Sequence, residues 1–124
     1  MGLLSGLMGN ASEVDQDDLD SLLNDTLVDG ESVQKAYKVI RDMFIFTNKR
    51  LILIDKQGVT GSKVEMLTIP YSKITKFSKE SAGHFDLDAE LKIWIGSEPQ
   101  PLVKEFKAGD NINDVYRVLG QFVL

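Results

Sequence analysis

Two neighbouring apolar runs constrain the fold of this chain more than any other feature. Residues 43–46 read Met-Phe-Ile-Phe and residues 51–54 read Leu-Ile-Leu-Ile, with the turn sequence Thr-Asn-Lys-Arg between them. The pattern predicts a β-hairpin. A strand with one solvated face alternates apolar and polar residues, but these two runs are apolar on both faces. One face belongs to a core, so either a helix of this chain or another subunit has to cover the second face.

The rest of the chain after Gly30 shows mainly the period-two pattern of strands. The segment 87–95 has the clearest alternation, with Leu91 and Ile93 on one face and Glu90 and Trp94 on the other. Pro70 ends its segment because proline cannot donate a hydrogen bond to a strand ladder. Seven strands are expected, at residues 32–41, 43–47, 51–55, 63–69, 74–81, 87–95 and 102–107.

Amphipathic helices are expected at both ends of the chain. Residues 12–29 carry a stripe of leucines, begin at the N-cap residue Ser12 and stop at Gly30. The last helix follows the N-cap residue Asp110. Its apolar face is formed by Ile112, Val115, Leu119, Phe122 and Val123. We therefore expect an acidic helical segment, residues 1–30, to pack on a domain formed by residues 31–124.

The order of helix, seven strands and helix predicts a mainly β protein with helices, of the α+β class. A strongly bent seven-stranded antiparallel sheet leaves an open end that the last helix can close. This order favours a barrel like that of pleckstrin-homology (PH) domains. Lipocalin-like and other α+β arrangements remain compatible with it.

Several short motifs make the chain resemble the bacterial PH domain family, over roughly residues 12–124. The most specific are the Thr47-Asn48-Lys49-Arg50 turn and Ile69-Pro70-Tyr71 followed by Ile74. The others are Gly30-Glu31, Ala36-Tyr37-Lys38, Arg41-Asp42, Gln57-Gly58 and the stretch from Phe85-Asp86 to Leu91-Lys92. The resemblance implies seven antiparallel strands in two bent sheets, closed by a C-terminal capping helix, with an extra N-terminal helix. It also implies self-assembly into rings through sheet edges, as in some members.

The resemblance does not extend to phosphoinositide binding. The better-known eukaryotic PH domains hold that ligand with a set of basic residues around the first hairpin. Here Lys35, Lys38 and Arg41 are spaced three apart, so Lys38 points to the opposite face of the strand from the other two.

Charge and composition exclude some partners. The net charge is −5, and eight acids but no base lie in residues 1–31. No basic stripe is present, so we expect no nucleic-acid binding. Leu3, Leu4, Leu7 and Met8 suggest a membrane wedge, but their acidic surroundings make membrane binding the weaker alternative. The chain has no cysteine, in keeping with a reducing, cytoplasmic location.

No constellation of residues points to catalysis, a cofactor or a metal. His84 has Asp86 nearby but no cysteine or activated nucleophile. Asp15 and Asp17 begin like a calcium loop, but the pattern fails at its sixth and twelfth positions. Lys73, Lys76 and Lys79 do not share one face of a strand. We therefore expect a protein that is not an enzyme.

The leading functional prediction is a protein-interaction or self-assembly module that forms a cyclic homo-oligomer. Its support is the doubly apolar hairpin together with Trp94, which lies on the polar face of its strand. The candidate interface residues are Phe44, Phe46, Ile52, Ile54 and Trp94. Another protein as partner remains an alternative, as do a small-molecule pocket at the uncapped end of the barrel and a peripheral lipid-binding module.

Overall fold

Two antiparallel sheets and two helices make up the structure, a computed structural model that describes residues 16–39, 42–57, 63–81, 89–107 and 112–124. The first sheet has the strand order β1-β2-β3-β4 and the second the order β5-β6-β7. The strands of the first sheet are β1 (Val33–Val39), β2 (Asp42–Thr47), β3 (Arg50–Gln57) and β4 (Lys63–Pro70). Those of the second are β5 (Ile74–Ser81), β6 (Ala89–Ile95) and β7 (Leu102–Phe106). The seven predicted strands are confirmed, with shifts of a few residues at their ends.

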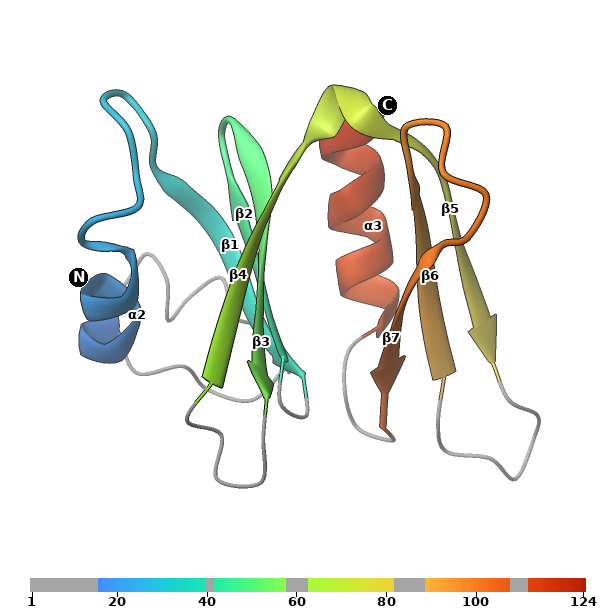
Figure 1. The fold of residues 1–124 in the computed structure, drawn as a ribbon, viewed down its shortest axis with the longest axis horizontal. Helices are drawn as coiled ribbons and strands as arrows, with labels where there is room; N and C mark the ends of the chain where they lie inside the picture. The colour runs from blue at the N-terminus through green and yellow to red at the C-terminus, as the bar shows by residue number, and fades with distance from the viewer. Residues whose placement is uncertain (1–15, 40–41, 58–62, 82–88, 108–111) are drawn as a thin grey trace.

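The chain passes from the first sheet to the second at a tight corner. The 3-10 turn η1 (Tyr71–Lys73) follows Pro70 and leads directly into β5. Figure 1 shows the two sheets splayed on either side of the C-terminal helix α3 (Ile112–Val123). The predicted capping of the sheets by this helix is confirmed, whereas its proposed N-cap, Asp110, lies outside the described residues.

The main core lies between the two sheets and α3. It is built from the inward residues of both sheets, including Phe44, Phe46, Leu91 and Ile93, which are all fully buried. Val115, Val118 and Leu119 of α3 complete it. At the closed end the ring of Phe122 stacks on Tyr71, with ring centres 4.8 Å apart. The predicted inward face of β6 is therefore confirmed.

A second, smaller core lies on the outer face of the first sheet. There the helix α2 (Gln16–Leu23) packs Leu19 and Leu23 onto Ala36, Ile45 and other outward residues of β1–β3. Figure 1 shows α2 beside this sheet, on the side away from α3. The helix of this chain thus covers the second apolar face of the hairpin, which settles the choice that the sequence left open.

The N-terminal helix ends before the predicted end at residue 29. The described part of it ends at Leu23, where the amides of Thr26 and Leu27 both donate to the carbonyl of Leu23. The side chains of Asn24 and Asp25 compete with helical backbone hydrogen bonds, which favours a turn. Gly30, with φ of +79°, lies in the following turn before β1 instead of at the end of the helix.

Candidate binding surfaces

Four of the five predicted interface residues are buried within the single chain. Phe44 and Phe46 point into the core between the sheets, whereas Ile52 and Ile54 point outward beneath α2. The strand register explains why these residues divide between the two faces of the sheet, because Phe44 pairs with Leu53 and Ile45 pairs with Ile52 across the hairpin. These four residues were predicted as candidate interface residues; in the structure they lie on opposite faces of the first sheet, and both faces are covered within the chain.

Trp94, the fifth predicted residue, lies on the outer face of the second sheet and is half-buried. Its strand partner is Lys76, whose Nζ lies 4.7 Å from the centre of the indole ring. Lys79 instead lies over the ring of Tyr116, on the side of α3. The three lysines of residues 73–79 therefore form no common patch, as the strand phase predicted.

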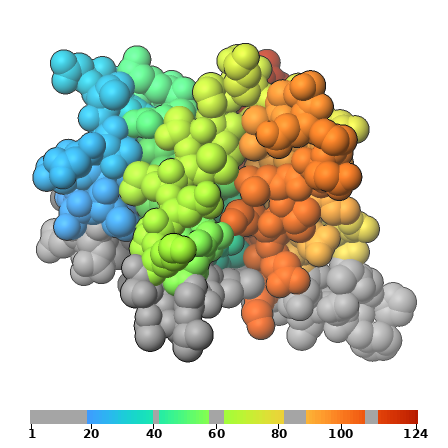
Figure 2. All heavy atoms as spheres, in the orientation of Figure 1, coloured from blue at the N-terminus to red at the C-terminus, as the bar shows by residue number. Residues whose placement is uncertain are grey.

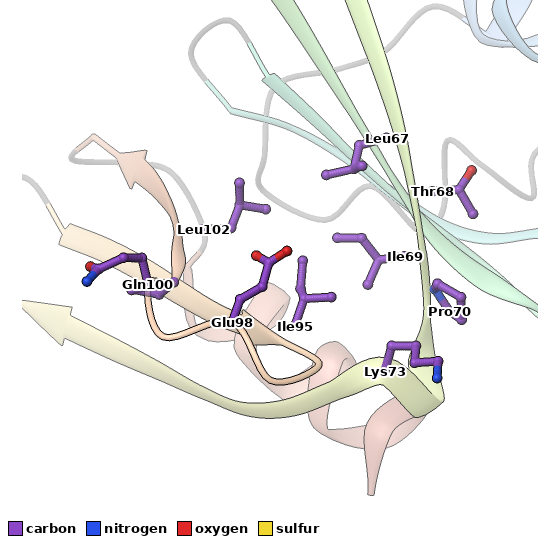
Figure 3. Close-up of a pocket in the computed structure, with 10 residues that line it drawn as sticks. Leu67, Thr68, Ile69, Pro70, Lys73, Ile95, Glu98, Gln100 and Leu102 are labelled. Carbon is purple, nitrogen blue, oxygen red and sulfur yellow. The ribbon is translucent and has the colours of Figure 1, made fainter.

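A cleft of about 450 Å³ opens where the free edge of β4 faces the second sheet, and we call it the β4–β7 cleft. The strands β4 and β7 belong to different sheets and are not paired with each other. Figure 3 shows Leu67 and Ile69 of β4 facing Ile95 and Leu102 across it, with Glu98 directed into the space between. The polar residues Thr68, Lys73 and Gln100 and the prolines Pro70 and Pro101 complete its lining.

Of the four sheet edges, that of β4 is the longest one without an irregularity in its pairing. Its pairing with β3 runs without a bulge from Pro70 to Lys63. The edge strands β1 and β5 each contain a register shift, and β7 has only five residues. Bulges and short edge strands discourage pairing with other chains, so β4 is the edge best suited to accept another strand. Figure 2 shows this strand beside the segment from β6 to β7 on one face of the molecule.

A buried ion pair fixes the connection between α2 and the first sheet. Nε and Nη2 of Arg50 donate to the two carboxylate oxygens of Glu31, at 2.8 and 2.9 Å. The Glu31 side chain is fully shielded from solvent and also accepts from the Thr47 hydroxyl, at 2.6 Å. Arg50 donates further to the carbonyl of Thr26, at 2.7 Å. We call this set of contacts the Glu31–Arg50 latch.

The latch strongly favours the ionised form of Glu31. Hydrogen bonds from Arg50 lower the pKa of this carboxyl from 4.5 to about 2, against the opposing effect of burial, with further help from Thr47. In the sequence, Glu31 and Arg50 stand out only as parts of the family motifs. Their pairing joins positions 19 residues apart, for which periodicity gives no signal.

A second ionic cluster joins the two sheets. Nζ of Lys104 on β7 lies 3.5 Å from a carboxylate oxygen of Asp42 and equally far from one of Asp55. Burial raises the pKa of Asp42; Lys104 opposes the rise, and the neighbouring Asp55 adds to it. The cluster is satisfied internally, so we assign it to the contact between the sheets and not to a ligand.

The described residues contain no group of three or more histidine, cysteine, aspartate or glutamate residues placed to hold a metal. His84, Asp86 and Asp15 lie outside those residues, so the expectation that they form no catalytic or metal site stays a prediction. Within the same described ranges, no helix is long and apolar enough to cross a membrane.

Two sheets at an angle, joined by a tight corner and closed by a C-terminal helix, define a module of the pleckstrin-homology fold. The chain belongs to the bacterial PH domain family, whose model matches residues 2–123. The fold and the family resemblance drawn from the sequence are thereby confirmed.

Similar proteins cover nearly the whole chain. The uncharacterized protein YjqA of Bacillus subtilis (strain 168) is 50% identical over 120 residues, which are 96% of each chain. YozO of the same strain is 32% identical, over 92% of this chain and 94% of its own length. The crystal structure of a pleckstrin homology domain from Shewanella amazonensis SB2B has a TM-score of 0.84 and 52% identity, with 97% of each chain covered. A second crystal structure, from Shewanella loihica PV-4, has a TM-score of 0.77 and 53% identity, over 94% of this chain and 99% of the other.

Proposed function

We propose that this protein is a non-catalytic scaffolding module that assembles with copies of itself through sheet edges. The observation that carries the proposal is the regular edge of β4 beside the apolar β4–β7 cleft. An edge strand presents unpaired backbone groups, and an extended segment that joins it gains hydrogen bonds along its length. The apolar floor formed by Leu67, Ile69 and Ile95 offers a place for the alternate side chains of such a segment.

The occupant that we propose is an edge strand of a second copy. Contacts of one edge with a different edge are head-to-tail, and they close into rings when the rotation between copies permits. The doubly apolar hairpin no longer supports this proposal, since α2 covers it. The assembly therefore depends on backbone edges and not on the four buried hairpin residues.

The β4–β7 cleft also favours a second candidate function, the binding of a small molecule. Ligand pockets typically enclose about 300–1,000 Å³, and the volume of this cleft falls in that range. Its lining is mostly apolar with a few polar groups, among them Glu98. This cleft lies between the sheets, in contrast to the barrel-end pocket that the sequence analysis considered.

Light scattering over a range of micromolar concentrations tests the assembly directly. We expect a mass several times the 13.8 kDa of one chain. Hydrogen exchange should show added protection of β4 amides as the concentration rises. A constant monomeric mass would contradict the proposal, and a retained small molecule in a native mass spectrum of that monomer would favour the second candidate.

A variant pair tests whether the cleft takes part. Glu98→Tyr places a bulky side chain where Figure 3 shows the carboxylate directed into the cleft. We expect it to shift the mass toward that of the monomer. Asp20→Tyr is the control, because Asp20 is exposed on α2, away from the cleft residues. Equal masses for both variants would exclude the cleft as the contact.

A further inference from the structure

The outer face of the second sheet carries its charges in separate rows. Alternate residues of β5, β6 and β7 point away from the core, and the strand register aligns them across the sheet. The first row holds Lys76 and Trp94, the middle row Ser78, Lys92 and Val103, and the last row Glu80, Glu90 and Glu105. One end of this outer face is therefore basic and aromatic, and the other end is acidic.

The acidic row is unfavourable in the isolated chain. Glu90 lies directly across from Glu80 on one neighbouring strand and from Glu105 on the other. Like charges in directly opposed positions destabilise a sheet. Lys92 offsets part of this repulsion, with its Nζ 3.0 Å from a carboxylate oxygen of Glu80. Among the described residues, neither Glu90 nor Glu105 forms an ion pair.

The opposite end of the same face presents a cation and an aromatic ring. The ammonium of Lys76 lies over the indole of Trp94, and Lys76 itself is exposed. Tryptophan is enriched at protein interfaces, and its ring can pack against a partner while its neighbours supply charge. Val103, 43% exposed, adds apolar surface in the middle row. No described element packs over this face, whereas α2 covers the outer face of the first sheet.

We propose that this outer face docks on the same face of a second copy about a two-fold axis. The axis lies in the interface, perpendicular to the strands, so that Lys76 and Trp94 of each copy meet the acidic row of the other. A two-fold contact uses one surface twice, and a surface with opposite charges at its two ends complements itself. This proposal rests on the proposed function as a self-assembling module, and it adds to the edge contact a second contact of a different kind.

The size of the face predicts a weak contact that depends on salt. Three strands about 4.8 Å apart, with eight, seven and five residues, span roughly 14 Å by about 17–26 Å. That is smaller than the surface of a standard stable interface, about 800 Å² on each partner. The contact then relies on charge complementarity, and we expect it to dissociate as salt screens the charges. An apolar contact at a sheet edge would not show this dependence.

The fluorescence of Trp94 reports on this face alone, because the chain has no other tryptophan. We expect its emission to shift to shorter wavelength, and its quenching by iodide to fall, as the protein concentration rises. Raising the NaCl concentration from about 50 mM to about 500 mM should reverse both changes, since the screening length falls severalfold.

Charge-exchange variants test the pairing of the two ends. Lys76→Glu and Glu90→Lys should each weaken the association reported by Trp94 about tenfold. The double variant carries the exchanged charges and should recover most of the loss. Lys49→Glu and Asp20→Lys make the same charge changes at exposed positions outside both proposed contacts, in the turn after β2 and on α2, so they should leave the Trp94 signal unchanged.

The outcomes separate this proposal from the proposed function. A mass that rises with concentration while Trp94 emission and quenching stay constant would overturn the face contact and leave edge assembly intact. Failure of the double variant to recover would also overturn it. A monomer at every concentration would contradict the proposed function, and this contact with it.

Discussion

Glu31 is the residue whose environment departs most from that of a solvated side chain. It is fully shielded, yet it accepts hydrogen bonds from Arg50, Thr47 and the amide of Val28. A buried carboxylate is tolerated only when its oxygens are satisfied in this way. The turn after β2, which sequence analysis identified mainly through a resemblance, therefore has a physical role in holding the segment that leads from α2 to β1.

Removing the guanidinium of Arg50 from the Glu31–Arg50 latch should lower the free energy of unfolding substantially. Arg50→Ala leaves the Glu31 carboxylate buried without its ionic partner, and we expect a loss of roughly 3–5 kcal/mol in the free energy of unfolding. Urea denaturation measures the loss. Lys49→Ala, at an exposed neighbouring position, is the matched control and should change stability by less than about 0.5 kcal/mol.

The lowered pKa of Glu31 also predicts how the stability of the fold changes as the pH falls. The pKa of Glu31 is about 2 in the folded chain and near 4.5 when unfolded, so its stabilising contribution is present above pH 4.5. The contribution is lost as the pH falls from 4.5 toward 2. The difference in stability between the protein and Glu31→Gln should shrink over this window. A difference that stays constant from pH 6 to pH 3 would contradict the assigned pKa.

At the scale of elements, the alternating pattern in the sequence of β6 matches the alternation between buried and outward-facing side chains. Leu91 and Ile93 are fully buried, whereas Glu90 and Trp94 face outward. Leu91→Ala should cost roughly 2–5 kcal/mol, since it leaves a cavity between the sheets. Glu90→Ala should be close to neutral, because it also relieves repulsion within the acidic row. Similar losses for the two variants in urea melts would show that the faces are wrongly assigned.

The helix α2 protects an apolar surface that would otherwise face water. Its described part is about two turns long, and isolated helices of that length are not stable, so side-chain packing holds this part in place. Leu19→Asp should displace it and expose Ile45 and Ile52. We expect increased binding of an apolar dye and aggregation. Asp20→Asn, at an exposed position on the same helix, should cause neither.

At the scale of the whole molecule, a substitution in the buried hairpin tests folding, whereas a substitution at Trp94 on the outer face tests assembly. Phe44 lies in the core between the sheets, so Phe44→Glu should unfold the chain at any concentration. Trp94 lies on the outer face, so Trp94→Glu should fold and lower the mass measured by light scattering. Circular dichroism distinguishes the two results, and a folded Phe44→Glu variant would contradict the burial described above.

The sequence by itself determined the types and order of the elements and the two-sided apolar character of the hairpin. Alternation is a local property, so it shows which residues of β6 share a face without any knowledge of the fold. The family motifs then identified the architecture. The division into residues 1–30 and 31–124 and the cytoplasmic location remain predictions.

Only the tertiary structure decided which element covers each face. The periodicity of residues 43–54 requires a second layer but does not show which segment supplies it. The contact of Arg50 with the carbonyl of Thr26, which ties the segment after α2 to the first sheet, also joins residues far apart in the chain. The β4–β7 cleft and the row of Glu80, Glu90 and Glu105 depend on the register of strands joined by loops. Such register is set by packing between segments far apart in the chain, which the local pattern of one segment does not contain.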